Sequence, residues 1–234
     1  MVRAWPGSPP SPRSEALSLF IREKPREPDM PAREPARRSP REDPSGNARF
    51  DVMLPGATAF DTALRSWIVA RQTPAGLQIA AIVSQVGGVG VMRWIAVFAT
   101  IFLMARARRP AALAVIIAPL LALAAYAGTR RFFPRVRPPG AAGFHEAASS
   151  FPSAHATTSA AVCFTLAYFL WRERFLAAPA AMAIAIVPPL CVGLSRLYLD
   201  VHWSTDVLAG WCAGLAILAV AVSFYRLWPA PDES

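Results

Sequence analysis

Five long apolar runs follow one another from residue 91 onward. They cover residues 91–105, 111–128, 156–171, 176–194 and 206–225, and charged residues are nearly absent inside them. At a rise of about 1.5 Å per residue, helices of about 15 to 20 residues approach the ~30 Å thickness of the hydrocarbon core of a bilayer. The pattern therefore predicts an all-α integral membrane bundle with five spanning helices, or six if a further span precedes residue 91.

Residues 50–90 lead into this bundle with a weaker pattern. The stretches 60–68 and 76–90 are moderately apolar but short, and the second is rich in glycine. We expect interfacial helices here, or an approach to the first span in which 76–90 extends the following helix. Residues 91–228 then form the membrane core, and residues 229–234 form a C-terminal tail.

Residues 1–49 form a separate region with almost no apolar periodicity. They hold 10 of the 23 prolines and nine of the 23 arginines of the chain. Such a segment buries too little apolar surface to offset its ordering entropy, so we expect a disordered Pro/Arg-rich tail. Two alternatives stay open: a basic tether to anionic lipid headgroups, and translation that begins at Met30 or Met53.

Composition agrees with a membrane protein. Hydrophobic residues make up 54% of the 234 residues and charged residues 17%, whereas soluble domains carry about 25% charged residues. The net charge of +9 comes from arginines in the tail and at the ends of the apolar runs, which is a membrane layout. A basic face for nucleic acid would be concentrated on one folded surface, so no nucleic-acid partner is expected. The three cysteines Cys163, Cys191 and Cys212 are predicted to be buried apolar residues.

The loops between the runs carry an uneven set of arginines. Three lie in 106–109 and two in 172–174, and consecutive spans place both loops on one side. The positive-inside tendency assigns that side to the cytoplasm. Residues 129–155 and 195–205 then lie on the opposite side, and the first of these segments carries four further arginines against the tendency. This exception predicts a binding task for those arginines.

Three polar clusters flank the spans on that opposite side. The first, residues 130–138, is a basic run whose guanidinium groups match the oxygens of a phosphate. The second, residues 149–155, contains a Pro152-Ser153 turn before a helix whose first N–H groups would face an anion, with His155 in that turn. Taken alone, each cluster is also compatible with an ordinary solvated membrane boundary.

The third cluster, residues 195–206, holds Ser195-Arg196, His202 and Asp206. His202 and Asp206 are one helical turn apart, so the carboxylate could orient the imidazole and raise its basicity. Alternation of the spans gathers all three clusters at one end of the bundle. We therefore expect a site for phosphoryl transfer in which His202 attacks phosphorus, Asp206 orients it and His155 protonates the leaving oxygen. No acidic cluster is available to hold Mg²⁺, so no metal is expected.

The clusters resemble the three-part signature of the type 2 phosphatidic acid phosphatase superfamily, which also contains the vanadium haloperoxidases. The first motif of that family, Lys-x6-Arg-Pro, corresponds to residues 130–138 with arginine at the lysine position. The second, Pro-Ser-Gly-His, corresponds to residues 152–155 with alanine at the glycine position. The third, Ser-Arg-x5-His-x3-Asp, is matched in full at residues 195–206.

The resemblance covers roughly residues 60–225 and implies hydrolysis of a lipid-linked phosphate through a phosphohistidine intermediate, without a metal or other cofactor. It also implies a set of phosphate-binding residues: Arg130, Arg137, Ser153, Ala154 and Arg196. Candidate substrates are phosphatidate, phosphatidylglycerophosphate and a polyprenyl diphosphate, and membrane lipids are the expected surroundings. We expect a bacterial inner membrane and an active site on the extracytoplasmic face. The alternatives are a non-catalytic protein that binds or transports anionic lipids, and a vanadate-dependent peroxidase.

Overall fold

The computed structural model describes residues 57–141 and 149–228 of the chain. The predictions for the tail at 1–49 and for residues 229–234 concern residues outside this described part. Within it, all regular structure is helical, so the all-α prediction is confirmed.

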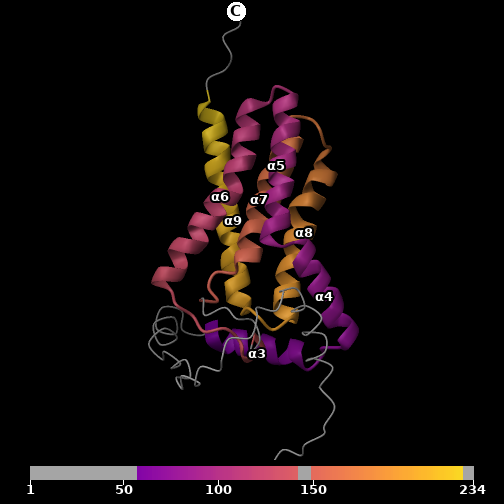
Figure 1. The fold of residues 1–234 in the computed structure, drawn as a ribbon, viewed down its shortest axis with the longest axis vertical. Helices are drawn as coiled ribbons and strands as arrows, with labels where there is room; N and C mark the ends of the chain where they lie inside the picture. The colour runs from indigo at the N-terminus through magenta and orange to yellow at the C-terminus, as the bar shows by residue number, and fades with distance from the viewer. Residues whose placement is uncertain (1–56, 142–148, 229–234) are drawn as a thin grey trace, which may run out of the picture.

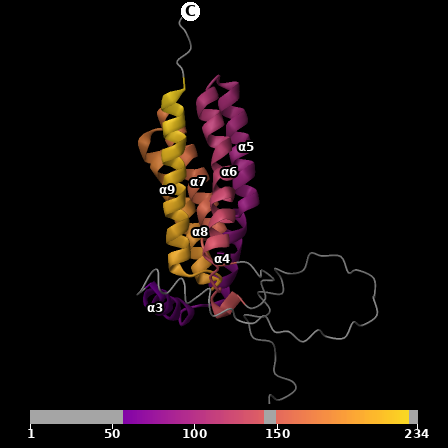
Figure 2. The ribbon, with the colours of Figure 1, turned by 90° about the vertical axis from the view of Figure 1, so that its left-hand side faces the viewer.

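Five helices form an upright bundle, and each corresponds to one of the apolar runs (Figure 1). They are α5 (Val89–Ala105), α6 (Arg109–Phe132), α7 (Ala154–Arg172), α8 (Ala178–Tyr198) and α9 (Ser204–Leu227). Successive helices run in opposite directions, because the connections between them are made alternately at the upper and the lower end (Figure 2). A short 3₁₀ turn, η1 (Pro139–Ala141), lies in the connection from α6 to α7.

Helix α7 lies in the middle of the bundle, packed against α5, α6, α8 and α9. Its closest approach is to α9, at Gly210 and Gly214. A Cβ atom on Gly214 would lie 2.4 Å from the Cβ of Ala160, and one on Gly210 would lie 2.9 Å from the backbone nitrogen of Thr157. Small residues spaced by four let membrane helices approach closely. This contact places the N-terminal ends of α7 and α9 side by side.

Three helices, α6, α8 and α9, are each long and apolar enough to cross a membrane. Helix α4 (Pro74–Val86) and α5 form a pair, bent by 41°, that gives a fourth candidate. Helix α7 begins with several polar residues and falls outside this set, so a fifth span stays a prediction. The chain is an integral membrane protein.

The region before the bundle divides into two helices with different positions. Helix α3 (Ala57–Val69) lies across the lower end of the bundle (Figure 1), as expected for an interfacial helix. Helix α4 packs along α8 and continues into α5 after a break at Gly87 and Gly88. The alternative, in which 76–90 extends the following helix, therefore describes α4 better than an interfacial position does.

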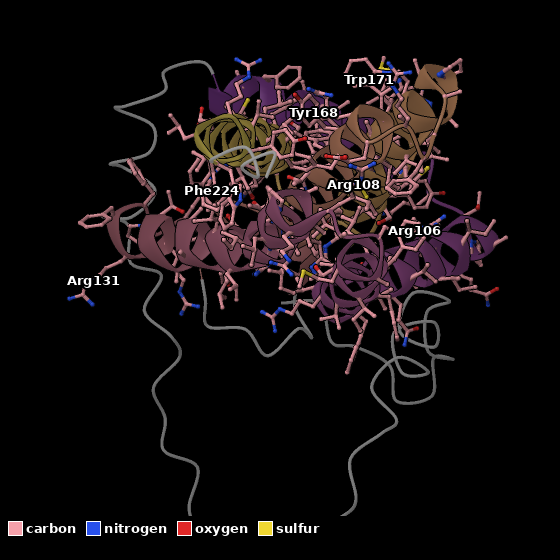
Figure 3. All side chains as sticks on the ribbon, turned by 90° about the horizontal axis from the view of Figure 1, so that it is seen from above. Arg106, Arg108, Arg131, Tyr168, Trp171 and Phe224 are labelled. Atoms are coloured by element: carbon pink, nitrogen blue, oxygen red, sulfur yellow. The ribbon has the colours of Figure 1, made fainter. Side chains whose placement is uncertain are left out.

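The two arginine-bearing loops meet at the upper end of the bundle. Arg108 Nε lies 3.2 Å from a carboxylate oxygen of Glu173, and Figure 3 shows Arg106 and Arg108 at this end. The prediction that both loops share one side is confirmed. The cysteine prediction is wrong in part: Cys163 is buried, but Cys191 and Cys212 are exposed because they lie on outward faces of α8 and α9.

Candidate active site

The first and second clusters are held together by hydrogen bonds between their backbones and side chains. The N–H of Ser150 donates to the carbonyl of Arg135 at 2.8 Å, and the N–H of Arg135 donates to Ser149 Oγ at 2.9 Å. The N–H of Ser153 donates to the carbonyl of Asp206 at 3.1 Å. Residues from three separate parts of the sequence thus meet at the lower end of the bundle.

His202 lies in the short connection between α8 and α9 and is almost fully buried. Its Nδ1 lies 2.9 Å from the carbonyl oxygen of Ser150. A carbonyl only accepts hydrogen bonds, so Nδ1 carries the proton and Nε2 presents its lone pair. Arg137 Nη1 lies 3.2 Å from this Nε2 and 3.0 Å from the carbonyl oxygen of Val201.

Burial lowers the pKa of His202 to about 4, with the charges of Arg196 and Arg137 acting in the same direction and Asp206 opposing them. The ring is therefore neutral at physiological pH. A neutral imidazole with a fixed tautomer and an available Nε2 is the form that attacks an electrophile.

Asp206 lies in the first turn of α9 and has several partners. Its Oδ2 accepts a hydrogen bond from the N–H of Trp203 at 2.9 Å and lies 3.5 Å from His202 Nδ1. Its Oδ1 lies 2.6 Å from Arg135 Nη1. The nearest acceptor for His202 is therefore the carbonyl of Ser150, and Asp206 acts on the imidazole mainly as a neighbouring negative charge.

A cavity of about 240 Å³ lies beside His202. Five of the residues singled out in the sequence line it: Arg137, Ala154, His155, Arg196 and His202. Its remaining lining residues are Val89, Arg93, Ala122, Leu123, Tyr126 and Thr158. A cavity of about 590 Å³ lies at the other end of the bundle, between α7 and α8, but neither His155 nor His202 lines it.

Ala154 and Ser153 lie at the start of α7, whose first N–H groups have no partner within the helix. Ala154 is the first residue of α7 and has no positive φ, so its Cβ introduces no backbone strain. Ser153 Oγ is fully buried and has no hydrogen-bond partner among the described residues. Ser153 itself does not line the cavity, but its neighbour Ala154 does, and a buried hydroxyl without a partner is suited to an anionic ligand.

Arg130 lies apart from the other candidates. Helix α6 continues past the predicted end at Gly128, so Arg130 falls in its last turn. Its guanidinium carbon lies 5.5 Å from the centre of the Tyr126 ring, one turn earlier on the same face. Tyr126 lines the cavity, whereas Arg130 is exposed and does not line it.

Arg196 is held by a residue that the sequence analysis did not single out. Its Nη1 donates to Ser84 Oγ of α4 at 2.7 Å, and both side chains are buried. The bent α4–α5 segment therefore contributes to the site as well as to the bundle. Ser84 is a single serine within a Gly-rich apolar stretch, so the sequence gives no sign that it binds Arg196.

Helix α3 contributes a second missed group, Asp61, which is fully buried. Its Oδ2 lies 2.6 Å from Arg135 Nη2, and its Oδ1 accepts a hydrogen bond from the N–H of Thr205 at 2.9 Å. The hydroxyl of Ser204 also donates to Oδ1. Burial raises the pKa of Asp61, but the hydrogen bonds from Arg135, Ser204 and Thr205 outweigh it and hold this pKa below its usual range.

One turn later on α3, Arg65 forms a two-pronged contact with Asp200. Arg65 Nε and Nη2 lie 2.7 and 2.8 Å from the two carboxylate oxygens. Asp200 is buried and has a φ of 57°, a left-handed conformation that costs energy for a residue other than glycine. This contact thus fixes the turn that leads into His202.

Among the described residues, no three side chains of the types His, Cys, Asp and Glu are grouped so that they could hold a metal ion. The polar atoms around the cavity are instead guanidinium groups, imidazoles, hydroxyls and backbone N–H groups. Such a donor set suits an anion with several oxygens.

The described part of the chain is thus a helical membrane protein with a cavity at one end of the bundle that is lined by guanidinium groups and imidazoles. Residues 131–229 match the PAP2 superfamily. The resemblance noted from the three motifs is thereby confirmed.

Two curated proteins are similar to this chain. Phosphatidylglycerophosphatase B of Bacillus subtilis is 41% identical over 98 residues, which cover 41% of this chain and 48% of the relative. A putative undecaprenyl-diphosphatase of Escherichia coli is 39% identical over 71 residues, which cover 30% of this chain and 32% of the relative. The chain thus spans about half or less of the length of these relatives.

The fold is also similar to that of a crystal structure, the transmembrane PAP2-type phosphatidylglycerolphosphate phosphatase of Bacillus subtilis. The TM-score is 0.66 and the sequence identity 23%, over 80% of this chain and 98% of the other. At this identity the likeness concerns the fold alone.

Proposed function

We propose that this protein is a membrane lipid phosphatase that hydrolyses a lipid-linked phosphate ester through a phosphohistidine intermediate. The observation that carries the proposal is the arrangement of His202, whose Nδ1 proton is directed to the carbonyl of Ser150 while Nε2 stands beside Arg137 at the cavity. The similarity to two proteins named as lipid phosphatases supports the same conclusion.

In the first step, Nε2 of His202 attacks phosphorus and the bond to the lipid oxygen breaks. Arg137 and Arg196 stabilise the charge on the phosphoryl oxygens, together with Ser153 and the N–H groups at the start of α7. His155 donates a proton to the leaving lipid oxygen. The products are the lipid alcohol and a phosphoryl group bound to His202.

In the second step, water attacks the phosphohistidine and free phosphate leaves. His155 has lost its proton in the first step, so it now accepts one from the water. From the first step until the bond between phosphorus and Nε2 breaks, the His202 ring carries a positive charge, which Asp206 stabilises at the distance of 3.5 Å given above. The cycle ends with both imidazoles in their starting protonation states.

His155 stands in the first turn of α7, before the apolar part of that helix. Burial lowers its pKa to about 3, and the positive charges of Arg196 and Arg137 act in the same direction. In the empty site this ring is neutral. A bound phosphate dianion neutralises those cations and draws a proton to His155, so the acid is formed only when substrate is present.

The proposed substrates are phosphatidate, phosphatidylglycerophosphate or a polyprenyl diphosphate. Part of the cavity is lined by apolar residues of α5 and α6, namely Val89, Ala122 and Leu123, which suits a lipid chain. The arginine-bearing loops lie at the opposite end of the bundle, so the positive-inside tendency supports a site on the extracytoplasmic face of a bacterial inner membrane.

The test is a phosphate-release assay on the full chain in detergent, with a panel of lipid phosphates and with chelator present. We expect release from at least one lipid, no effect of the chelator, and loss of release in His202→Ala. Lipid binding without release would support the alternative of a non-catalytic lipid-binding protein. Loss of release on chelation would contradict the metal-independent mechanism.

A further inference from the structure

Arg93 is a charge in a membrane helix that the proposed mechanism does not use. It lies in the second turn of α5, within the α4–α5 pair that forms a candidate span. Among the described residues, Arg93 forms no hydrogen bond and no ion pair. Its neighbours Trp94 and Phe98 are exposed apolar side chains, as expected on a lipid-facing surface. A charged residue at such a position is costly to keep and marks a functional site by default.

Arg93 lines the same cavity as the two histidines. Three guanidinium groups line this cavity, those of Arg93, Arg137 and Arg196, and no carboxylate does. A single phosphate monoester carries a charge of about −1.5 to −2 near pH 7. Arg137 and Arg196 already balance that charge. The guanidinium of Arg93 is therefore matched only by a ligand that carries further negative charge.

The lining residues indicate where this extra charge lies. His202 and Arg137 lie in connections at the end of the bundle, while Arg93 and Val89 come from α5 and Leu123 from α6. A lipid whose terminal phosphorus meets His202 in this cavity would have its next polar group within the same lining, where Arg93 is the charged residue contributed by α5. The position of Arg93 thus fits a group between the reacting phosphate and the lipid chain.

We propose that Arg93 forms a subsite for a second phosphate, so that the preferred substrates carry a second phosphate group between the hydrolysed phosphate and the lipid chain. A lipid diphosphate and a glycerol-linked pair of phosphates share this chemistry. Phosphatidate and a polyprenyl monophosphate lack it. The inference depends on the proposed phosphatase function, since it assigns the substrate class of that site.

The experiment compares Arg93→Gln with the wild-type chain on four lipids. Two of them carry two phosphates, a polyprenyl diphosphate and phosphatidylglycerophosphate, and two carry one, phosphatidate and a polyprenyl monophosphate. We expect kcat/KM to fall about tenfold on at least one two-phosphate lipid, as for the loss of one hydrogen bond to a charged group. On the one-phosphate lipids it should change less than about threefold, as for a lost long-range charge in a hydrated site. Arg93→Lys should restore part of the loss.

Arg131→Gln is the matched control, because it removes the same charge from an exposed residue of the last turn of α6 (Figure 3). It should leave the ratio between the two lipid classes unchanged. A readout without lipid comes from inhibition by inorganic diphosphate and by inorganic phosphate. Arg93→Gln should weaken inhibition by diphosphate about tenfold and leave inhibition by phosphate unaltered.

Equal losses on both lipid classes, or no loss on either, would overturn the subsite while leaving the phosphatase function intact. Absence of phosphate release by the wild-type chain from all four lipids would instead contradict the phosphatase function itself. Should Arg93→Gln fail to fold, the subsite is tested with Arg93→Lys, by its inhibition by diphosphate relative to its inhibition by phosphate. An unchanged ratio of diphosphate to phosphate inhibition in that variant would overturn the subsite.

Discussion

Asp61 and Arg135 form a buried ion pair in which the carboxylate Oδ2 lies 2.6 Å from Nη2 of the guanidinium. The other terminal nitrogen of the same guanidinium, Nη1, lies 2.6 Å from Oδ1 of Asp206. One arginine thus joins α3, which lies across the end of the bundle, to the first turn of α9. This chain of charges sets the position of the turn that carries His202, because Asp206 also accepts the N–H of Trp203.

Removal of Asp61 should destabilise the protein. Asp61→Ala leaves the buried Arg135 with one carboxylate instead of two, and the loss of one partner of a buried ion pair costs about 3–5 kcal/mol. Thermal unfolding in detergent measures the effect. Ser66→Ala, an exposed position on the same helix, should change the free energy of unfolding by less than about 0.5 kcal/mol. Equal unfolding temperatures for Asp61→Ala and the wild type would show that α3 does not brace the site.

The two arginines of the first motif should differ in importance. Arg137 lies 3.2 Å from Nε2 of His202, and loss of one preorganised donor to a transition-state oxyanion costs about 10²–10³ in kcat. Arg137→Gln should therefore lower phosphate release by about that factor. Arg130→Gln removes an exposed group that rests on Tyr126 and should lower kcat less than about threefold, since exposed charges contribute little. Comparable losses in the two variants would place Arg130 at the reacting phosphate after all.

The pH dependence of kcat/KM should report the neutral form of His202. Its pKa is about 4, below the usual value near 6.5, so Nε2 stays available down to about pH 4 and protonation removes activity below it. The charge of Arg196 lowers this pKa, so Arg196→Gln should move the acid limb to higher pH.

Ionisation of the substrate phosphate near pH 6 affects wild type and variant alike, so the difference between the two profiles isolates the enzyme group. An acid limb that stays at the same pH in Arg196→Gln would contradict this assignment. An acid limb that moves to lower pH in Arg196→Gln would contradict the assignment even more strongly.

The contact between α7 and α9 should tolerate no added side chain. A Cβ on Gly214 would lie 2.4 Å from the Cβ of Ala160 and 2.9 Å from the backbone nitrogen of Ala161, so Gly214→Ala should cost about 1–3 kcal/mol as an overpacked core does. The same substitution at Gly128 meets nothing within 4 Å and should stabilise α6 by about 0.5–1 kcal/mol. Unfolding temperatures that shift in the same direction for both variants would contradict the close packing.

Much of the fold follows from the apolar runs. In lipid, a long apolar run is stable as a helix, because a helix satisfies all of its backbone hydrogen bonds. Each of the helices α5 to α9 corresponds to one such run. Helix ends are less well defined, because polar residues in a last turn do not stop a helix. Arg130 illustrates the point, since the extra turn of α6 carries it onto Tyr126 and away from the cavity.

The site was predictable where chemistry is concentrated in short motifs, as for His155 and His202, which line one cavity. Asp61 and Arg93 escaped the sequence analysis because neither belongs to a short motif, and Arg65, one turn after Asp61, pairs with Asp200 instead. Asp61 finds its partner 74 positions later, and Arg93 faces a cavity that only the folded bundle creates. The spacing of Arg135 and Arg137 gave no sign that one binds carboxylates while the other lies beside the nucleophile.

The role of His202 as the nucleophile is tested most directly by trapping the intermediate. A lipid substrate labelled in its terminal phosphate is mixed with the full chain, the reaction is stopped in alkali, and the labelled residue is located by mass spectrometry. We predict a phosphoryl group on His202. In His155→Ala the labelled fraction of His202 should rise when hydrolysis of the phosphohistidine is slowed more than its formation. Continued phosphate release by His202→Ala, or a label on another residue, would contradict the account.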